Sequence, residues 1–300
     1  MLKIAFSPIY QYQLPDGHRF PMIKYELLPE QLLYEGTISE NNLFHPPPLD
    51  EEIILLTHDA DYWIKLKELQ LTRKEIRKIG FPLSEKLVTR GTHIANGTLL
   101  CAQYAQQYGV AMNVAGGTHH SFTDRGEGFC LLNDIGIAAN YLLREHLAKK
   151  ILVVDLDVHQ GNGTAQIFRE EKRVFTFSMH GEKNYPTRKE QSDLDIGMAD
   201  KTEDRLYLQT LRETLPRLLD EVQPDFIFYL AGVDVLESDK LGRLSLSRAG
   251  CKERDKIVFQ HCRQHEIPVA VSMGGGYAVK IADIVEAHAN TFRVAQDLFF

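Results

Sequence analysis

The sequence predicts a single α/β domain in three layers, with a mainly parallel sheet between two layers of helices. Short apolar runs rich in β-branched and aromatic residues recur along the chain, and amphipathic stretches separate them. Strands that alternate with helices form crossover units, which build parallel sheets covered on both faces. Neither an internal repeat nor a Pro/Ser-rich linker divides the 300 residues, so we expect one domain over residues 1–300.

The individual elements follow from these two patterns. We expect buried strands at IAF near the start and then at VAMNVAG, ILVVDLDV, VFTFSMH, DFIFYLAG and IPVAVSMGGG. The amphipathic segments predict helices at Leu83–Tyr108, Ile135–Leu147, Glu203–Val222, Arg248–Glu266 and Val279–Phe299. The segment HPPPL at residues 45–49 is too short to separate two domains.

Composition and charge argue against several classes of protein. The net charge of −7 and the isoelectric point near 6.0 do not favour nucleic-acid binding, which usually needs a basic face. The four cysteines are scattered without a C-x-x-C pair, which is typical of a reducing compartment. No apolar run approaches the ~18 residues of a membrane span, and the N-terminal apolar stretch is too short for a signal peptide. We therefore expect a cytoplasmic protein; without a sustained heptad pattern, the oligomeric state stays open.

Polar clusters follow four of the predicted strands. GGTHH comes after VAMNVA, DLDVHQGNG after ILVV, AGVD after DFIFYL, and GGGY after VAVSM. The carboxyl ends of parallel strands meet at one edge of the sheet, where ligands bind in α/β proteins. The four clusters are therefore expected to converge there.

Two of these clusters contain a set of metal-binding side chains. Asp157 and His159 are two residues apart at a predicted strand end, so we expect their side chains to leave one face. Taken alone, this pair fits a buried hydrogen-bonded network or a helix cap better. Asp234, at a second strand end, favours a metal instead. Two carboxylates and one imidazole leave coordination positions open, which is the pattern of a catalytic zinc site. Asp155, one pleat earlier, is a candidate for orienting a histidine, or is a satisfied core carboxylate.

Further side chains at the same edge suit proton transfer and substrate binding. His119 and His120 form a candidate acid/base pair, although adjacent histidines on a loop are usually only solvated. Tyr277 follows three glycines and can donate to a developing oxyanion, or it is a packed aromatic residue at a flexible turn. Gly128 with Phe129 can supply one wall beside the metal and Tyr185 the opposite wall, although Phe and Tyr are most often core residues.

Together these motifs resemble the histone deacetylase family, in which GGTHH, GFCLLND, DLDVHQGNG, FSMH, AGVD and GGGY occur in this order. The resemblance also covers the N-terminal GHRFPMIKY. The motif HQGNG and the segment AGVDVLESDKLGRLSLS are most similar to the class IV branch and its bacterial relatives. The resemblance implies the arginase-deacetylase fold, one zinc ion, and hydrolysis of the Nε-amide of an acyl-lysine, acetyl or longer fatty acyl, in a protein or peptide. By position, it implies that the zinc ligands are Asp157, His159 and Asp234.

The resemblance also implies roles for the remaining residues. Water activated by the metal attacks the amide carbonyl, with His120 as general base and then general acid. His119 is its partner, oriented by Asp155, and Tyr277 polarises the carbonyl and holds the oxyanion. A structural monovalent cation such as K⁺ near Asp155 and Ser178 is typical of the family.

The channel residues are implied in the same way, and one position departs from the family's usual pattern. Phe129 and Tyr185 match the walls of the acyl-lysine channel, and Gly128 contacts the methylenes of the substrate. Asn162 stands where many members have an acid that supports the catalytic histidine. An amide stabilises an imidazolium less than a carboxylate does, so we expect a lower pKa for His120 than in acid-paired relatives.

Three other functions compete with a lysine deacylase. A deacetylase of small acetylated amines such as polyamines would use the same site. An arginase-like ureohydrolase would need bridging carboxylates for two manganese ions, commonly in D-x-H-x-D and D-x-D patterns. Gly161 stands two residues after His159, and Asp234 is followed by Val235 and Leu236, so neither pattern is completed by an acid. A non-catalytic acyl-lysine reader would not need every catalytic position filled, as it is here.

Overall fold

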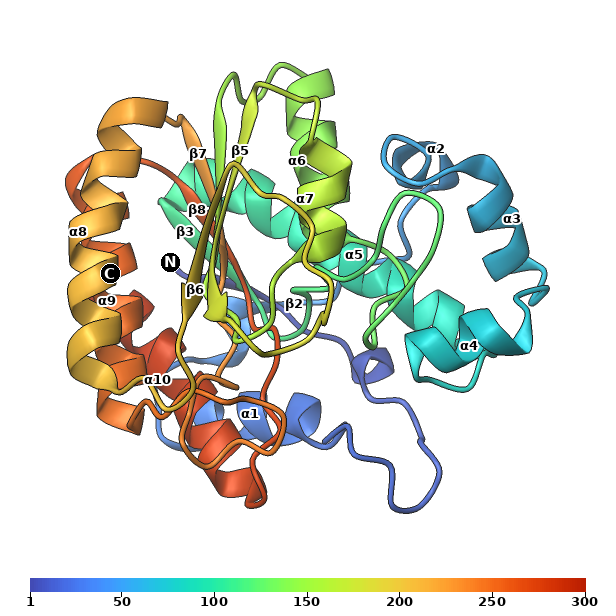
Figure 1. The fold of residues 1–300 in the computed structure, drawn as a ribbon, viewed down its shortest axis with the longest axis horizontal. Coiled ribbons are helices and arrows are strands. Elements are labelled where there is room, and N and C mark those ends of the chain that lie inside the picture. The colour runs from blue at the N-terminus through green and yellow to red at the C-terminus, as the bar shows by residue number, and fades with distance from the viewer.

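The computed structural model describes all 300 residues, and a single parallel sheet organises them (Figure 1). Its eight strands run in the order β2-β1-β3-β8-β7-β4-β5-β6, and every neighbouring pair is parallel. The strands are β1 (Lys3–Ala5), β2 (Leu43–Phe44), β3 (Val110–Asn113), β4 (Ile151–Asp155), β5 (Val174–Gly181), β6 (Leu194–Met198), β7 (Phe226–Leu230) and β8 (Val269–Ser272). All six predicted strands are present, and the predicted α/β class is confirmed.

Helices cover both faces of the sheet. In Figure 1, α8, α9 and α10 lie on one side of the strands, and α5, α6 and α7 on the other. The helices are α1 (Lys24–Tyr34), α2 (Glu51–Ile54), α3 (Ala60–Lys67), α4 (Arg73–Ile79), α5 (Glu85–Tyr108), α6 (Asp134–Arg144), α7 (Asn162–Phe168), α8 (Asp204–Val222), α9 (Arg248–Gln264) and α10 (Ile281–Phe299). This arrangement is the predicted three-layer one.

The central strands are apolar because both of their faces are covered. Every residue of β3, β4, β7 and β8 is buried. Their side chains join a continuous hydrophobic core of 85 buried residues. The chain therefore builds one core around one sheet.

Two edge strands and several helices were not predicted. The edge strand β6 alternates partly exposed and exposed residues up to its buried last residue, so its sequence LDIGM lacks the apolar run of a central strand. Helices α1 to α4 lie in the irregular first 80 residues, and α1 contains Pro29.

The expectation that Asp157 and His159 share one face of a strand is wrong, because β4 ends at Asp155. From Asp157 to His159, main-chain N–H groups donate to aspartate side chains instead of to the main chain of a neighbouring strand. The Asp157 N–H donates to Asp155 Oδ1 at 3.2 Å, and the His159 N–H donates to Asp157 Oδ1 at 3.0 Å. These Asx turns bring both side chains to the same side of the sheet edge.

A buried ion pair ties α9 to this edge. Arg254 and Asp255 are fully buried, and their charged groups are 2.8 Å apart. Arg254 Nη1 also donates to the carbonyls of Gly232 and Leu156, at 2.6 and 3.2 Å. Those carbonyls lie just beyond the C-terminal ends of β7 and β4, so Arg254 links the two strand ends through hydrogen bonds.

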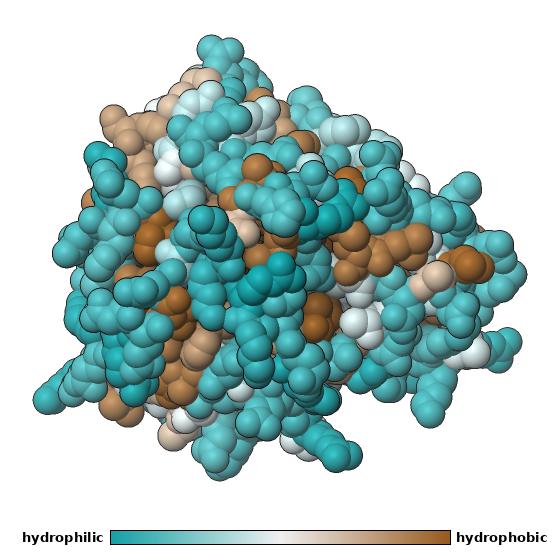
Figure 2. Space-filling view, turned by 90° about the horizontal axis from the view of Figure 1, so that it is seen from above, coloured by the Kyte–Doolittle hydropathy of each residue, from teal (hydrophilic) through white to brown (hydrophobic).

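The surface is mostly hydrophilic on the face drawn in Figure 2, where apolar residues gather in patches that hydrophilic side chains separate. None of the helices is both long enough and apolar enough to cross a bilayer.

Candidate active site

An aspartate–histidine–aspartate cluster lies where β4 and β7 end. Asp157 and His159 follow β4 and Asp234 follows the adjacent β7; one possible ligand atom from each lies within 4.8 Å of the others. His159 Nδ1 is 3.0 Å from Asp157 Oδ1 and 3.1 Å from Asp234 Oδ2. All three residues are buried. The structure thus brings together the three residues that the sequence predicted as metal ligands.

The environment of this cluster fits a metal ion. Main-chain N–H groups hold both carboxylates: Gly275 donates to Asp157 Oδ2 at 2.8 Å, and Val158 donates to Asp234 Oδ1 at 3.0 Å. The other oxygen of Asp234, Oδ2, is buried and accepts no well-aligned hydrogen bond, although His159 Nδ1 lies 3.1 Å away. Burial and the charge of Asp157 raise the pKa of Asp234 to about 7. A divalent cation among the three side chains would pair with the free oxygen and offset the repulsion.

Two neighbouring histidines lie beside the cluster with separate partners. His119 Nδ1 is 2.7 Å from Asp155 Oδ2, and His120 Nδ1 is 2.6 Å from Asn162 Oδ1. Burial lowers the pKa of His119, but Asp155 and Asp157 outweigh it and raise that pKa overall. Burial, reinforced by His119 and His159, lowers the pKa of His120 well below its usual range. The pair therefore splits into one histidine that favours a proton and one that stays neutral.

Tyr277 closes the other side of the cluster. Its ring centroid is 6.4 Å from that of His159, and its hydroxyl has no hydrogen-bond partner within the chain. Burial, then the charges of Asp234 and Asp157, raise the pKa of Tyr277 well above its ordinary value, so the phenol stays protonated. The preceding Gly274 has φ +62°, and a Cβ there would press on Leu230 at 2.5 Å. The glycines let the chain pass close to the cluster and aim a phenol donor at it.

A cavity of about 220 Å³ leads from the surface to these side chains. The Tyr185 ring stands almost perpendicular to that of His120, with centroids 4.9 Å apart. The Phe129 ring lies opposite, 6.1 Å from that of Tyr277. The cavity is lined by Arg19, Lys78, His120, Gly128, Phe129, His159, Tyr185, Leu241 and Tyr277. The structure thus forms a channel with aromatic walls, and it places Gly128, Phe129 and Tyr185 there.

Comparison with known proteins identifies the family. The model of the histone deacetylase domain matches residues 18–292. The chain belongs to the histone deacetylase family. Members of this family are deacetylase hydrolases and typically depend on a metal, and the buried Asp157–His159–Asp234 cluster fits that dependence.

Relatives of known sequence and structure agree with this assignment. An uncharacterized protein of Picosynechococcus is 44% identical, covering 99% of both chains. Histone deacetylase 2 of Arabidopsis thaliana is 29% identical over 95% of this chain and 78% of its own. The acetoin utilization protein AcuC of Staphylococcus aureus is 27% identical over 89% of this chain and 74% of its own. The crystal structure of a histone deacetylase homologue complexed with SAHA superposes with a TM-score of 0.85 and 25% identity, covering 99% of this chain and 84% of that one.

A second, smaller cavity lies on the inner side of the cluster. Its volume is about 40 Å³, and it shares His120, Phe129 and Tyr277 with the channel. Arg90, which donates to the Tyr10 carbonyl at 2.6 Å, also lines it. In this histone deacetylase fold, the channel and the inner cavity therefore meet at the cluster.

Sequence reasoning missed a buried lysine behind Tyr277. Lys24 is 1% exposed, and its Nζ donates to the Gly274 carbonyl at 3.0 Å and lies 5.9 Å from the Tyr277 ring centroid. Burial lowers the pKa of Lys24 to about 8, although Asp234 and Asp157 oppose the shift. The quoted motif GHRFPMIKY contains this residue, but nothing in that motif indicates that α1 packs beside the glycine turn.

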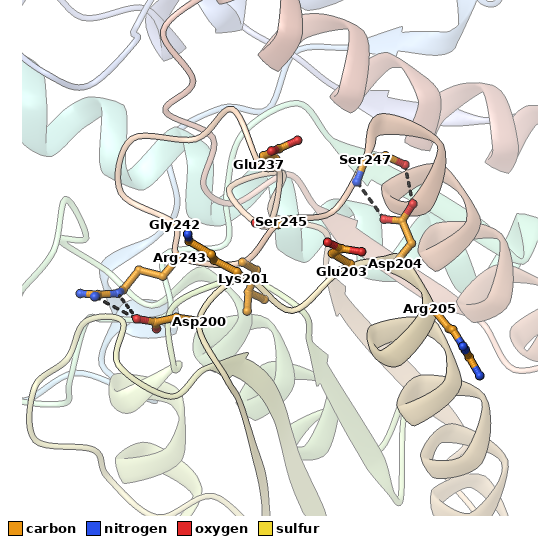
Figure 3. A pocket seen from close by; sticks show the side chains of 11 residues that line it. Asp200, Lys201, Glu203, Asp204, Arg205, Glu237, Gly242, Arg243, Ser245 and Ser247 are labelled. Carbon is orange, nitrogen blue, oxygen red and sulfur yellow. Dashed lines mark hydrogen bonds and ion pairs between the residues drawn. The ribbon is translucent and has the colours of Figure 1, made fainter.

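A much larger hollow, of about 830 Å³, lies around the start of α8 (Figure 3). Two of its carboxylates have partners within it: Arg243 lies 2.9 Å from Asp200, and the Ser247 hydroxyl donates to Asp204 at 2.6 Å. In Figure 3, Arg205 points away from the other side chains. No histidine or aromatic ring lines this hollow. The candidate site is the smaller, buried one at the sheet edge.

Proposed function

We propose that residues 1–300 form one catalytic domain, a zinc-dependent hydrolase that removes the acetyl group from the Nε-amide of lysine in proteins or peptides. One observation carries the proposal: an Asp–His–Asp cluster with a free carboxylate oxygen lies between a channel with aromatic walls and a small inner cavity. Two buried histidines and a phenol flank the same cluster. This combination supports amide hydrolysis better than binding alone.

Asp157, His159 and Asp234 would hold one zinc ion. Two carboxylates and one imidazole neutralise a divalent charge and leave coordination positions open. Zinc bound there supplies a Lewis acid for the amide carbonyl and lowers the pKa of coordinated water. A monovalent cation such as K⁺ beside Asp155 and Ser178, which pair across β4 and β5, belongs to the same proposal.

The chain's own groups handle the protons. His120, neutral because of its lowered pKa, accepts a proton as general base and delivers it to the leaving lysine amine. Asn162 orients its ring, and His119, held by Asp155, is its neighbour. Tyr277, protonated at neutral pH, donates to the developing oxyanion.

The two cavities favour a lysine carrying a short acyl group. The rings of Phe129 and Tyr185 suit the apolar stem of a lysine side chain. A cavity needs about 10–15 Å³ by the same measure to hold one water molecule, so the inner cavity holds roughly three. That volume suits an acetyl group and is too small for a long fatty chain.

A peptide panel that varies only in acyl length tests this proposal. We expect zinc-loaded protein to hydrolyse acetyl-lysine peptide with a higher kcat/KM than the myristoyl-lysine peptide. Equal or faster cleavage of the myristoyl peptide would overturn the acyl preference. Binding of every peptide without cleavage of any would overturn the hydrolase itself and favour an acyl-lysine reader.

A further inference from the structure

We propose that the channel mouth selects acyl-lysine substrates that carry a carboxylate next to the acylated side chain, and that Arg19 recognises this carboxylate. The inference rests on the proposed lysine deacetylase function and names the substrate class within it. It starts from the charged residues that line the mouth. Apart from the histidines, these are Arg19 and Lys78; no carboxylate lines the cavity.

Arg19 is a cation without a partner inside the protein. Its side chain is exposed and forms no ion pair, and its guanidinium carbon lies 5.1 Å from the centroid of the Phe129 ring, a wall of the channel. Stacking of this kind occupies one face of the guanidinium and leaves its N–H donors free. The planar fork of an arginine binds a carboxylate through two hydrogen bonds.

The backbone around Arg19 is held in place. His18 Nε2 donates to the Gly80 carbonyl at 2.9 Å, and the Phe20 N–H donates to His18 Nδ1 at 3.1 Å. The Phe20 ring packs against that of Phe129 at 5.2 Å. Arg19 therefore projects from a fixed point on the channel wall, so little backbone ordering opposes binding.

The neighbouring carboxylate, Glu127, already has three hydrogen-bond donors of its own. It accepts from Lys78 Nζ at 3.1 Å, Arg125 Nε at 3.0 Å and the Tyr185 hydroxyl at 2.8 Å. The main chain fixes Lys78 as well, because its carbonyl accepts the Gly128 N–H at 3.0 Å. Arg125 also pairs with Asp124, so the two carboxylates Glu127 and Asp124 are shared between Lys78 and Arg125. Arg19 is the third cation of this region and is left without a carboxylate.

This charge distribution separates two kinds of substrate. A polyamine bearing an acetyl group carries further ammonium groups, which the mouth repels and for which it offers no acid. Leu241, the aliphatic residue that lines the mouth, carries no charge and cannot bind an ammonium group. A substrate carboxylate next to the acyl-lysine would gain Arg19 as a partner. For exposed charges, the preference should be about two- to fivefold in kcat/KM.

Steady-state hydrolysis of end-capped acetyl-lysine peptides with Asp, Asn or Lys on either side provides the test. Free Nε-acetyl-lysine is compared with its α-amide, so that a main-chain carboxylate is distinguished from an acidic side chain, and an acetylated polyamine completes the panel. We expect kcat/KM to be highest for the Asp peptides, lower for the Asn peptides and lowest for the Lys peptides. The difference should appear in KM and shrink at high salt, because the contact is remote from the reacting bond.

Charge reversal assigns the effect to Arg19. R19E should invert the order of kcat/KM for the Asp and Lys peptides, with the change in KM. R263E is the matched control: Arg263 is exposed, unpaired and near the C-terminal end of α9, which precedes β8 and therefore lies at the opposite edge of the sheet. The R263E variant should keep the wild-type order of kcat/KM among the Asp, Asn and Lys peptides.

Three results would overturn the inference: the same kcat/KM for Asp, Asn and Lys peptides, the same change in R19E and R263E, or faster hydrolysis of the polyamine than of the peptides. Activity on peptides without any charge preference would remove the role of Arg19 and leave the deacetylase proposal intact. Failure to hydrolyse any member of the panel would remove the deacetylase proposal itself.

Discussion

His120 Nδ1 lies 2.6 Å from the side-chain oxygen of Asn162. An amide oxygen only accepts, so Nδ1 carries the proton and Nε2 is left free to take one. Burial, His119 and His159 hold the pKa of His120 well below its usual range, and the Asn162 hydrogen bond only partly opposes them. The sequence predicted a lower pKa for His120 than in relatives that have an acid at position 162, and that comparison stays a prediction.

Asn162→Asp should therefore raise the pKa of His120. A carboxylate beside the ring stabilises the imidazolium, typically by about one pH unit or more. A general base works when it is deprotonated, so the acidic limb of the kcat/KM profile should move to higher pH. Asn162→Ala removes the hydrogen bond and should move it the other way. An unchanged or lower apparent pKa in Asn162→Asp would contradict the assignment of His120.

Tyr277→Phe should lower kcat by about 10²- to 10³-fold, as the loss of one oxyanion donor does in other hydrolases. The Tyr277 hydroxyl has no partner within the chain, so its removal should leave zinc content and the thermal unfolding midpoint as in the wild type. Stopped-time assays with metal analysis of the same sample measure both. A fully active variant would exclude Tyr277 from the reaction.

Gly128→Ala should reduce kcat/KM by about 10²-fold, because a Cβ there would lie 2.6 Å from His120 Cδ2 and displace the ring. The residue also has φ +52°, which strains any side chain. Gly36→Ala separates the two effects: Gly36 has φ +76° but an added Cβ meets no atom within 4 Å. The control should lose some stability and no activity. Equal activity loss in both variants would count against the displacement of His120.

Arg254→Leu should lower the free energy of unfolding by about 3–5 kcal/mol, because it leaves the Asp255 carboxylate buried without its charge partner. Urea unfolding measures the change. Arg173→Leu is the surface control: the Arg173–Glu171 pair is half-exposed on the arginine side and should contribute under about 1 kcal/mol. Similar losses in the two variants would show that Arg254 is not the brace of the strand ends.

Fully buried parallel strands made much of the fold predictable. The strands at ILVVD and FIFYL are buried throughout and, apart from the terminal Asp155, apolar, because helices cover both faces. They therefore stand out from the rest of the sequence. The same logic placed the site, since polar residues that follow parallel strands must meet at one edge. Edge strand β6 lacks this signal because Asp195 and Gly197 interrupt its apolar residues.

Contacts from outside the strand–helix repeat were not predictable. Lys24 contacts the Gly274 carbonyl across 250 residues of sequence, in a region where α1 packs against α10. Arg19 lies in an irregular segment that has no periodicity to interpret. Both positions depend on tertiary packing, which local patterns do not encode.

Zinc titration of metal-free protein, with acetate release from an acetyl-lysine peptide as the readout, tests the central claim most directly. The buried Asp157–His159–Asp234 cluster offers one set of ligands. Activity should therefore rise linearly with added zinc, stop at about one equivalent per chain, and disappear with a chelator. A requirement for two equivalents of manganese, or zinc-saturated protein that binds the peptide and releases no acetate, would contradict it.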